Sequence, residues 1–214
     1  MILINFKTYA ESTGKKAIKL AKAAEKMSRE TGQKIIVIPQ VLDLKEVAKK
    51  VGIEVYAQHV DENDYGAFTG STPIEAAKEA GAKGSIINHS ENRISIEKIQ
   101  KTVEKAKQQQ FTIVVCVQNV EEAKIVDAFR PDYIAYEPQE LIGGTVSVST
   151  ARPEVIQDIV SSVSTPVIVG AGVKNMQDVK KSIELGAKGV LVASGVVKSK
   201  SVKKAIKELA EGLK

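Results

Sequence analysis

Short runs of apolar, often β-branched residues recur along the whole chain and alternate with segments of helical spacing. We predict strands at residues 2–5, 34–38, 54–57, 85–88, 112–116, 133–136, 167–169 and 189–192. These runs are apolar on both faces, which is typical of strands buried in a parallel sheet. Between most of them, apolar residues recur every three or four positions opposite lysines and glutamates, as at Ala17, Leu20, Ala21 and Ala24. This second pattern predicts amphipathic helices.

Eight strand–helix units without a break in composition predict one α/β domain, a single (β/α)8 barrel over residues 1–214. Such barrels typically need about 250 residues, so we expect a compact barrel with some shortened helices in these 214 residues. The short connection into Pro166 suggests one such place. An open, doubly wound sheet is the structural alternative.

Charge and cysteine content narrow the function classes. The chain has 31 Lys and Arg against 26 Asp and Glu, a net charge of +5. The lysines are spread over predicted helix faces, which favours a solvated surface and an anionic small-molecule substrate over nucleic acid. Cys116 is the only cysteine, so no disulfide can form within the chain. No apolar run approaches the ~20 residues of a membrane span. The apolar N-terminus is too short for a signal peptide, so we expect a cytoplasmic protein.

Candidate chemistry gathers where the predicted strands end, which is the functional face of a barrel. Glu137 follows an apolar run and precedes a proline and a glycine-bearing loop, so it could act as a general base beneath a movable lid. His89 and Lys7 also follow strands. Each residue alone also fits a structural role, as a core histidine, a surface lysine or a salt-bridged glutamate.

Small residues follow the last two predicted strands, as Gly170-Ala171-Gly172 and Ala193-Ser194-Gly195. They would let backbone N–H groups approach an anion where barrels commonly bind phosphate. A carboxylate, a histidine, a lysine and a phosphate cradle at one end of a barrel would surround a small phosphorylated carbonyl compound.

These motifs resemble those of the triosephosphate isomerase family in its short archaeal-type form, which has the TIM-barrel fold. The resemblance runs through Asn5-Phe6-Lys7, Asn88-His89-Ser90-Glu91, Ala135-Tyr136-Glu137-Pro138 with Ile142-Gly143, Gly170-Ala171-Gly172 and Val192-Ala193-Ser194-Gly195. It implies interconversion of dihydroxyacetone phosphate and D-glyceraldehyde 3-phosphate through an enediol(ate), in glycolysis and gluconeogenesis, without cofactor or metal.

The resemblance also implies roles for individual residues. Glu137 would move a proton between neighbouring carbons, His89 would polarise the carbonyl, and Lys7 and Asn5 would stabilise the enediolate. The implied substrate-binding residues are Asn5, Phe6, Lys7, Ile142, Gly143, Gly172, Ala193 and Ser194. The segment from Pro138 to about Thr150 would be the lid.

Some positions depart from the family pattern or stay open. The lid reads Gly143-Gly144-Thr145 where the family usually has glycine, threonine and glycine, and it lacks the tryptophan of larger members. Gly172 stands where those members have a serine. We expect Cys116 to be a packing residue rather than a nucleophile. Glu91 could act chemically or pair with a strand-end lysine.

Self-association is the remaining expectation. The resemblance implies that the loop from Tyr65 to Gly70 reaches a neighbouring subunit, with Thr69 near that subunit's site, in a dimer or tetramer. It implies no nucleic-acid or membrane partner. Competing readings are another phosphate-binding barrel enzyme, such as an aldolase or epimerase, and a non-catalytic anion-binding oligomeric barrel. The predicted strands lack the interior lysine of an aldolase, and two histidines are few for an epimerase metal site.

Overall fold

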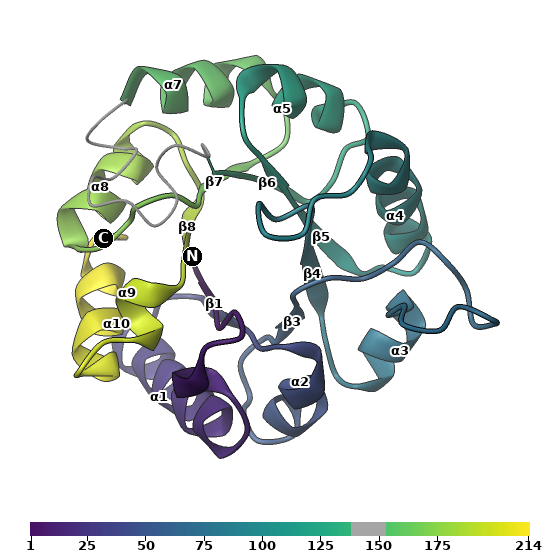
Figure 1. Cartoon of the computed structure of the whole chain (residues 1–214). Helices are drawn as coiled ribbons and strands as arrows, with labels where there is room; N and C mark the ends of the chain where they lie inside the picture. Colours follow the sequence, from purple (N-terminus) through teal and green to yellow (C-terminus); the bar gives the residue numbers. More distant parts are fainter. Residues whose placement is uncertain (138–152) are drawn as a thin grey trace.

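A ring of parallel strands lies inside a ring of helices in the computed structural model, which describes residues 1–137 and 153–214 (Figure 1). All the observed strand pairs are parallel. The strands are β1 (Ile2–Asn5), β2 (Ile35–Ile38), β3 (Tyr56–Ala57), β4 (Gly84–Ile87), β5 (Thr112–Val117), β6 (Tyr133–Tyr136), β7 (Val167–Val169) and β8 (Gly189–Val192).

The sheet runs in the order β2-β1-β8-β7-β6-β5-β4-β3. Its two edge strands meet through one parallel bridge between Val37 and Val55, and the Val37 N–H donates to the Glu54 carbonyl at 3.2 Å. β2 and β3 are therefore the most weakly paired neighbours in the ring. The prediction of a (β/α)8 barrel is confirmed.

Helices cover the outside of the ring (Figure 1). Those in the described residues are η1 (Ala10–Ser12), α1 (Lys15–Thr31), α2 (Val41–Ala48), α3 (Ile74–Glu79), α4 (Ile96–Gln108), α5 (Val120–Asp127), α7 (Pro153–Ser162), α8 (Met176–Glu184), α9 (Ser194–Val197) and α10 (Val202–Glu211). Several are only one to three turns long, as the chain length predicted. None of the helices in the described ranges is long and apolar enough to cross a membrane.

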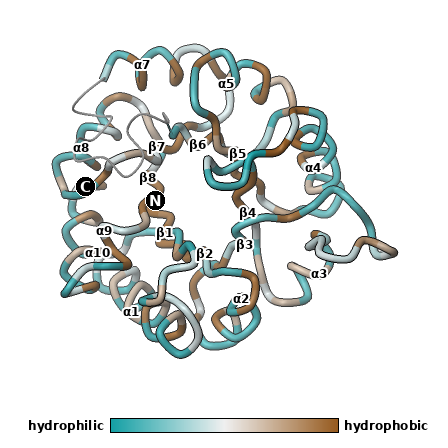
Figure 2. Tube along the Cα trace, viewed as in Figure 1, coloured by the Kyte–Doolittle hydropathy of each residue, from teal (hydrophilic) through white to brown (hydrophobic). Residues whose placement is uncertain are grey.

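Side chains alternate along each strand between two cores. One core fills the barrel and takes Leu3, Ile86, Cys116, Ala135 and Leu191 among its members. The larger core lies between the sheet and the helices. Apolar residues line the strands and the inner faces of the helices, whereas the outer faces are polar (Figure 2). Because both faces of every strand are buried, the strands read as continuous apolar runs in the sequence.

Four strands have the predicted bounds, namely β1, β6, β7 and β8. The predicted strand at 85–88 lies one residue too late. Asn88 has a left-handed φ of 58°, which takes its backbone out of the extended conformation, so β4 ends at Ile87. β3 is reduced to Tyr56–Ala57.

Candidate active site

Side chains that follow the strands keep the alternation of the strands, so every second one still faces the inside of the barrel and lines a cavity there. Leu3, Ala135 and Leu191 point into the barrel, and the residues two positions further on are Asn5, Glu137 and Ala193. All three line a cavity of about 620 Å³ at the carboxyl ends of the strands. Because every second side chain along a strand points to the same face, these three residues lie at one site.

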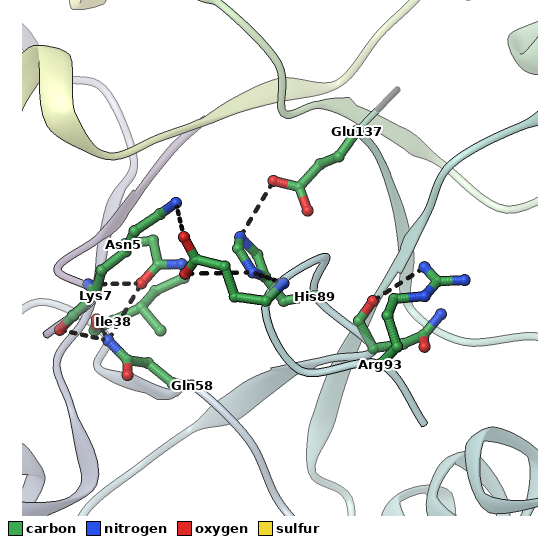
Figure 3. Close-up of polar contacts among 9 residues, drawn as sticks. Asn5, Lys7, Ile38, Gln58, His89, Arg93 and Glu137 are labelled. Carbon is green, nitrogen blue, oxygen red and sulfur yellow. Dashed lines mark hydrogen bonds and ion pairs between the residues drawn. The ribbon is translucent and has the colours of Figure 1, made fainter. Parts of the chain in front are cut away.

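Lys7 enters this cavity from a strained turn after β1. Its φ is 47°, a conformation that costs free energy for a residue with a side chain. Its N–H donates to Asn5 Oδ1 at 2.9 Å, and the Gln58 amide donates to the Lys7 carbonyl at 3.0 Å and approaches Asn5 Oδ1 at 3.2 Å. Gln58 thus ties both residues to the end of β3 (Figure 3).

The Lys7 ammonium pairs with Glu91, with Nζ 2.6 Å from Oε1. The Lys7 side chain is 15% exposed and that of Glu91 is 58% exposed. The pair therefore opens to solvent at the rim of the cavity. Of the two roles left open for Glu91, the structure shows the ion pair with the strand-end lysine, and it is not a buried pair.

His89 lies on the same side as Lys7, two residues after the end of β4. The Glu91 N–H donates to His89 Nδ1 at 3.1 Å. Because Nδ1 accepts this bond, the proton of the neutral imidazole sits on Nε2. His89 Nε2 faces Glu137 Oε1 at 3.5 Å, and both side chains are more than nine-tenths buried (Figure 3). A ring donor and a carboxylate thus face the same small volume.

Glu137 directly follows β6 and is held between two neighbouring strands. Its N–H donates to the Val117 carbonyl at 2.8 Å, and the Gly170 N–H donates to the Tyr136 carbonyl at 2.9 Å. Gly170 has no side chain where Glu137 passes: a Cβ at Gly170 would lie 2.6 Å from Glu137 Cγ. A glycine at the end of β7 therefore makes room for the carboxylate.

Cys116 lies behind Glu137 in the barrel core. Burial raises the pKa of the Cys116 thiol well above its ordinary value, and the neighbouring Glu137 carboxylate raises it further. The thiol therefore stays protonated, as expected of a packing residue rather than a nucleophile.

The loop that carries His89 is fixed by a partly buried polar cluster around Glu122. Arg93 and Asn88 both contact Glu122 Oε1, Asn88 at 3.0 Å, and the Gln118 N–H donates to Glu122 Oε2 at 2.9 Å. Asn88 also donates to the Cys116 carbonyl at 2.8 Å. This cluster connects the end of β4 to the start of α5, so His89 sits on a braced turn.

Small residues line the part of the cavity at the ends of β7 and β8. They are Gly170, Ala171 and Gly172 after β7 and Ala193, Ser194 and Gly195 after β8. Gly172 has a φ of 68°, which favours glycine. Among the described residues, no group of three or more His, Cys, Asp and Glu side chains could hold a metal ion.

The structure brings together most of the residues named from the sequence. Asn5, Lys7, His89, Glu137, Gly172, Ala193 and Ser194 all line the cavity. The Phe6 side chain instead packs fully buried in the outer core. Ile142 and Gly143, like the whole segment from Pro138 to Thr150, lie outside the described residues. Sequence reasoning missed Gln58, Tyr9 and the role of Gly170; position at a strand end could have indicated Gln58.

This fold and cavity define the class of (β/α)8-barrel enzymes whose active site lies at the carboxyl ends of the strands. The triosephosphate isomerase family model matches residues 1–209. A triosephosphate isomerase of Methanothermus fervidus is 50% identical over 196 residues, covering 89% of this chain and 88% of that protein. Those of Thermoplasma volcanium, over 193 residues, and Methanocaldococcus jannaschii, over 196, are each 46% identical and cover 89% of this chain, and 89% and 90% of the respective relatives.

The chain belongs to the triosephosphate isomerase family. The resemblance seen in the sequence is confirmed, as is the prediction that the protein is an isomerase.

Proposed function

We propose that this cavity interconverts dihydroxyacetone phosphate and D-glyceraldehyde 3-phosphate, the reaction of the family to which the chain belongs, and that Glu137, His89, Lys7 and Asn5 carry it. The observation that supports this assignment most directly is the 3.5 Å approach of His89 Nε2 to Glu137 Oε1, with the Lys7 ammonium in the same cavity. An enediolate fits the chemistry of this set, since it needs a base beside the carbon and donors beside both oxygens.

Glu137 is the base of the proposal. Its carboxylate takes the proton from the hydroxyl-bearing carbon of dihydroxyacetone phosphate, and the electron pair of that C–H bond forms the C=C bond of the enediolate. The carbonyl π pair moves onto oxygen. The proton of the original hydroxyl group passes to this oxygen, with His89 relaying it, and the same carboxyl returns its proton to the neighbouring carbon, which gives the aldehyde. Burial of Glu137, only 6% exposed, keeps competing water from the base.

His89 donates from Nε2 to the substrate oxygens as a neutral ring. The Glu91 N–H donates to Nδ1 and fixes the orientation of the ring, so Nε2 stays directed at the substrate oxygens. Lys7 supplies the fixed positive charge. Its partner Glu91 is more than half exposed, so water screens that pair and the ammonium can turn toward the developing oxyanion. Asn5 donates from its amide.

The substrate phosphate lies in this proposal against Gly172, Ala193 and Ser194. These small residues leave their backbone accessible in the cavity that Lys7 also lines, as in the common phosphate site of barrels. The competing readings, another phosphate-binding barrel enzyme and a non-catalytic anion-binding barrel, gain no support from the comparisons.

The decisive test is turnover of glyceraldehyde 3-phosphate in a coupled assay. We expect Glu137→Asp, which withdraws the carboxylate by one methylene, to lower kcat by about 10²-fold or more with little change in KM. Glu97→Asp, on the exposed start of α4, is the matched control and should keep wild-type kcat. Wild-type kcat in Glu137→Asp would remove the base assignment, and a wild-type protein without turnover would return the site to the anion-binding reading.

We further propose that two copies associate through the loop from Tyr65 to Gly70. Tyr65 and Phe68 are 59% and 52% exposed. The base of the loop is fixed, because the Thr72 N–H donates to Asp61 Oδ2 at 2.7 Å and the Asp61 N–H to the Thr72 carbonyl at 2.9 Å. Aromatic residues are enriched in interfaces between subunits, and a loop that is already ordered loses less conformational entropy on association.

A second cavity, of about 410 Å³, offers this loop a receptor on the other copy. It opens beside Lys7 and is lined by Gln58, His59, Glu91 and Thr72 among others, with the exposed Val41 at its edge. Insertion of the loop would bring Thr69 toward Asn5 and Lys7 of the other copy. The active site would then be complete only in the oligomer, whether dimer or tetramer.

Light scattering tests the association. We expect Tyr65→Ser with Phe68→Ser to yield a monomer with lowered kcat, whereas Ile125→Ser, an exposed apolar residue on α5, should keep at least the dimer. An unchanged mass in the loop variant would contradict this interface.

We place the enzyme in the cytoplasm, as one barrel domain over residues 1–214; the single, buried Cys116 suits a reducing compartment.

A further inference from the structure

A second concave site lies on the outside of the barrel, where α1 runs beside α9 and α10 (Figure 1). It is a groove of about 570 Å³. One wall is a stripe of α1 at helical spacing, formed by Lys16, Lys19, Leu20 and Ala23. The other wall is the segment 197–203, which joins α9 to α10. The groove shares no lining residue with the cavity that holds Glu137.

The rim of this groove is strongly cationic. It carries five lysines, Lys16, Lys19, Lys198, Lys200 and Lys203, and one carboxylate, Glu11. All five ammonium groups lie more than 4 Å from every carboxylate in the described part of the chain. The groove therefore concentrates uncompensated positive charge.

This arrangement costs stability unless an anion neutralises it. Lys16 and Lys19 are three positions apart on α1, a spacing at which like charges repel. Two of the lysines are held in place: Lys16 Nζ donates to the Ala10 carbonyl at 3.0 Å, and Lys198 Nζ lies 4.1 Å from the centre of the Tyr9 ring. Because these side chains are already ordered, a ligand would lose less entropy in binding them.

The floor of the groove is apolar. Leu20 and Val197 are 4% exposed each and lie beneath the lysines together with Ala23 and Val202. Cations on two facing walls suit a chain of phosphates better than one phosphate, and an apolar floor suits a flat organic group. The volume lies in the range of small-molecule sites, about 300–1,000 Å³.

We propose that this groove binds an organic polyphosphate, of the class of nucleoside di- and triphosphates. The phosphates contact the lysines from both walls, and the organic group lies against Leu20, Ala23 and Val197. The position gives the occupant access to the loops of the active-site cavity, because Lys198 covers Tyr9 and α9 begins at Ser194, and both Tyr9 and Ser194 line that cavity.

Isothermal titration with ATP, without Mg²⁺ and at low ionic strength, tests the site. Removing three groove charges in Lys19→Gln/Lys200→Gln/Lys203→Gln should weaken binding by about tenfold or more, since each lysine would make a charge-assisted bond to a phosphate oxygen. The matched control removes three exposed lysines of α1 and α10 outside the groove, Lys22→Gln/Lys204→Gln/Lys207→Gln. It has the same net charge and should change the Kd by less than about twofold if the groove is the site.

Two further titrations locate the ligand. Lys7→Ala protein should bind ATP as the wild type does, whereas loss of binding there would place the ATP in the active-site cavity and overturn the proposal. Inorganic tripolyphosphate should bind more weakly than ATP; equal affinity would refute the role of the apolar floor. Equal weakening in both triple variants would show that only net charge attracts the ligand. The readout is binding, so it stands or falls independently of isomerase turnover.

Discussion

Gly170 and Glu137 lie side by side at the ends of two adjacent strands, so close that Gly170 has no room for a side chain. A Cβ at Gly170 would lie 2.6 Å from Glu137 Cγ and 3.2 Å from its Cδ and Oε1. Strand pairing sets this register, because Tyr136 pairs with Val169 and the next residue of each strand is Glu137 or Gly170. The Glu137 carboxylate can therefore point in its observed direction only because Gly170, the residue after β7, has no side chain.

Gly170→Ala tests this relationship. The added methyl group should push the Glu137 carboxylate out of its position, and displacement of a catalytic group by about 1 Å can cost about 10²-fold in kcat. We expect that loss with a KM close to the wild-type value, measured in the coupled isomerase assay. Glu137→Ala removes the Cγ that the methyl group would meet, so Gly170→Ala should cost little further kcat in that background, and the double variant should lose less kcat than the product of the two single losses. Strictly multiplicative losses would show that the two residues act independently.

Gln58→Met tests whether the strained turn at Lys7 is held by the Gln58 amide. That amide approaches Asn5 Oδ1, the Lys7 carbonyl and the Ile38 carbonyl at 3.0–3.2 Å. Without it, we expect Lys7 to relax from its φ of 47° and kcat/KM to fall by about tenfold, the effect of about 1.4 kcal/mol. Gln100→Met, which removes an amide on the exposed face of α4 outside both cavities, is the matched control and should leave kcat/KM unchanged. Steady-state kinetics of both variants decide the point.

The sequence predicted the barrel and the cluster around Glu137, His89 and Lys7 because both follow from simple rules. Strands buried on both faces give apolar runs, and the carboxyl ends of parallel strands meet on one face. Alternation also fixes which side chains point inward: with Leu3 and Asn5 inside, Phe6 must point outward, and its side chain does pack in the outer core. The substrate-binding expectation for Phe6 rested on the resemblance, which does not separate side-chain from backbone contacts.

Other features depend on distances between segments far apart in the chain. The fit of Gly170 around Glu137 and the reach of Gln58 to Lys7 are set by register and side-chain rotamers, which no periodicity encodes. The same holds for Glu122, which looks like one more charged residue at a helix start. Its partner Arg93 lies 29 positions away and meets it only in the folded chain.

Arg93→Met should destabilise the protein by leaving Glu122 without its cation. Glu122 is nearly buried, with a side chain 10% exposed, whereas Arg93 is 35% exposed. Solvent screening at Arg93 reduces the loss below that of a fully buried pair, and we expect about 1–3 kcal/mol in the free energy of unfolding. Urea denaturation measures it, with the exposed Arg29→Met on α1 as a control expected to be neutral. Arg93→Met/Glu122→Gln should be more stable than Arg93→Met, because it removes the uncompensated charge; a further loss would contradict this account.

Asp127 gives the fold a predictable weakness in acid. Its carboxylate accepts the Ser164 N–H at 3.0 Å and the Thr165 N–H at 2.8 Å. Burial acts to raise the pKa of Asp127, but these bonds and the Thr165 hydroxyl outweigh it and hold the pKa below 3.8. Because the folded pKa is the lower one, the stabilisation is complete above the unfolded pKa and is lost as pH falls through the folded value.

Asp127→Asn should lower Tm at pH 7 by about 2–4 °C, the effect of about 1 kcal/mol. The gap to wild type should narrow by pH 3 in scanning calorimetry. Asp158→Asn, on the exposed face of α7, should show no gap at either pH. A gap for Asp127→Asn that is equal at pH 7 and pH 3 would mean that the charge of Asp127 does not stabilise the connection into β7.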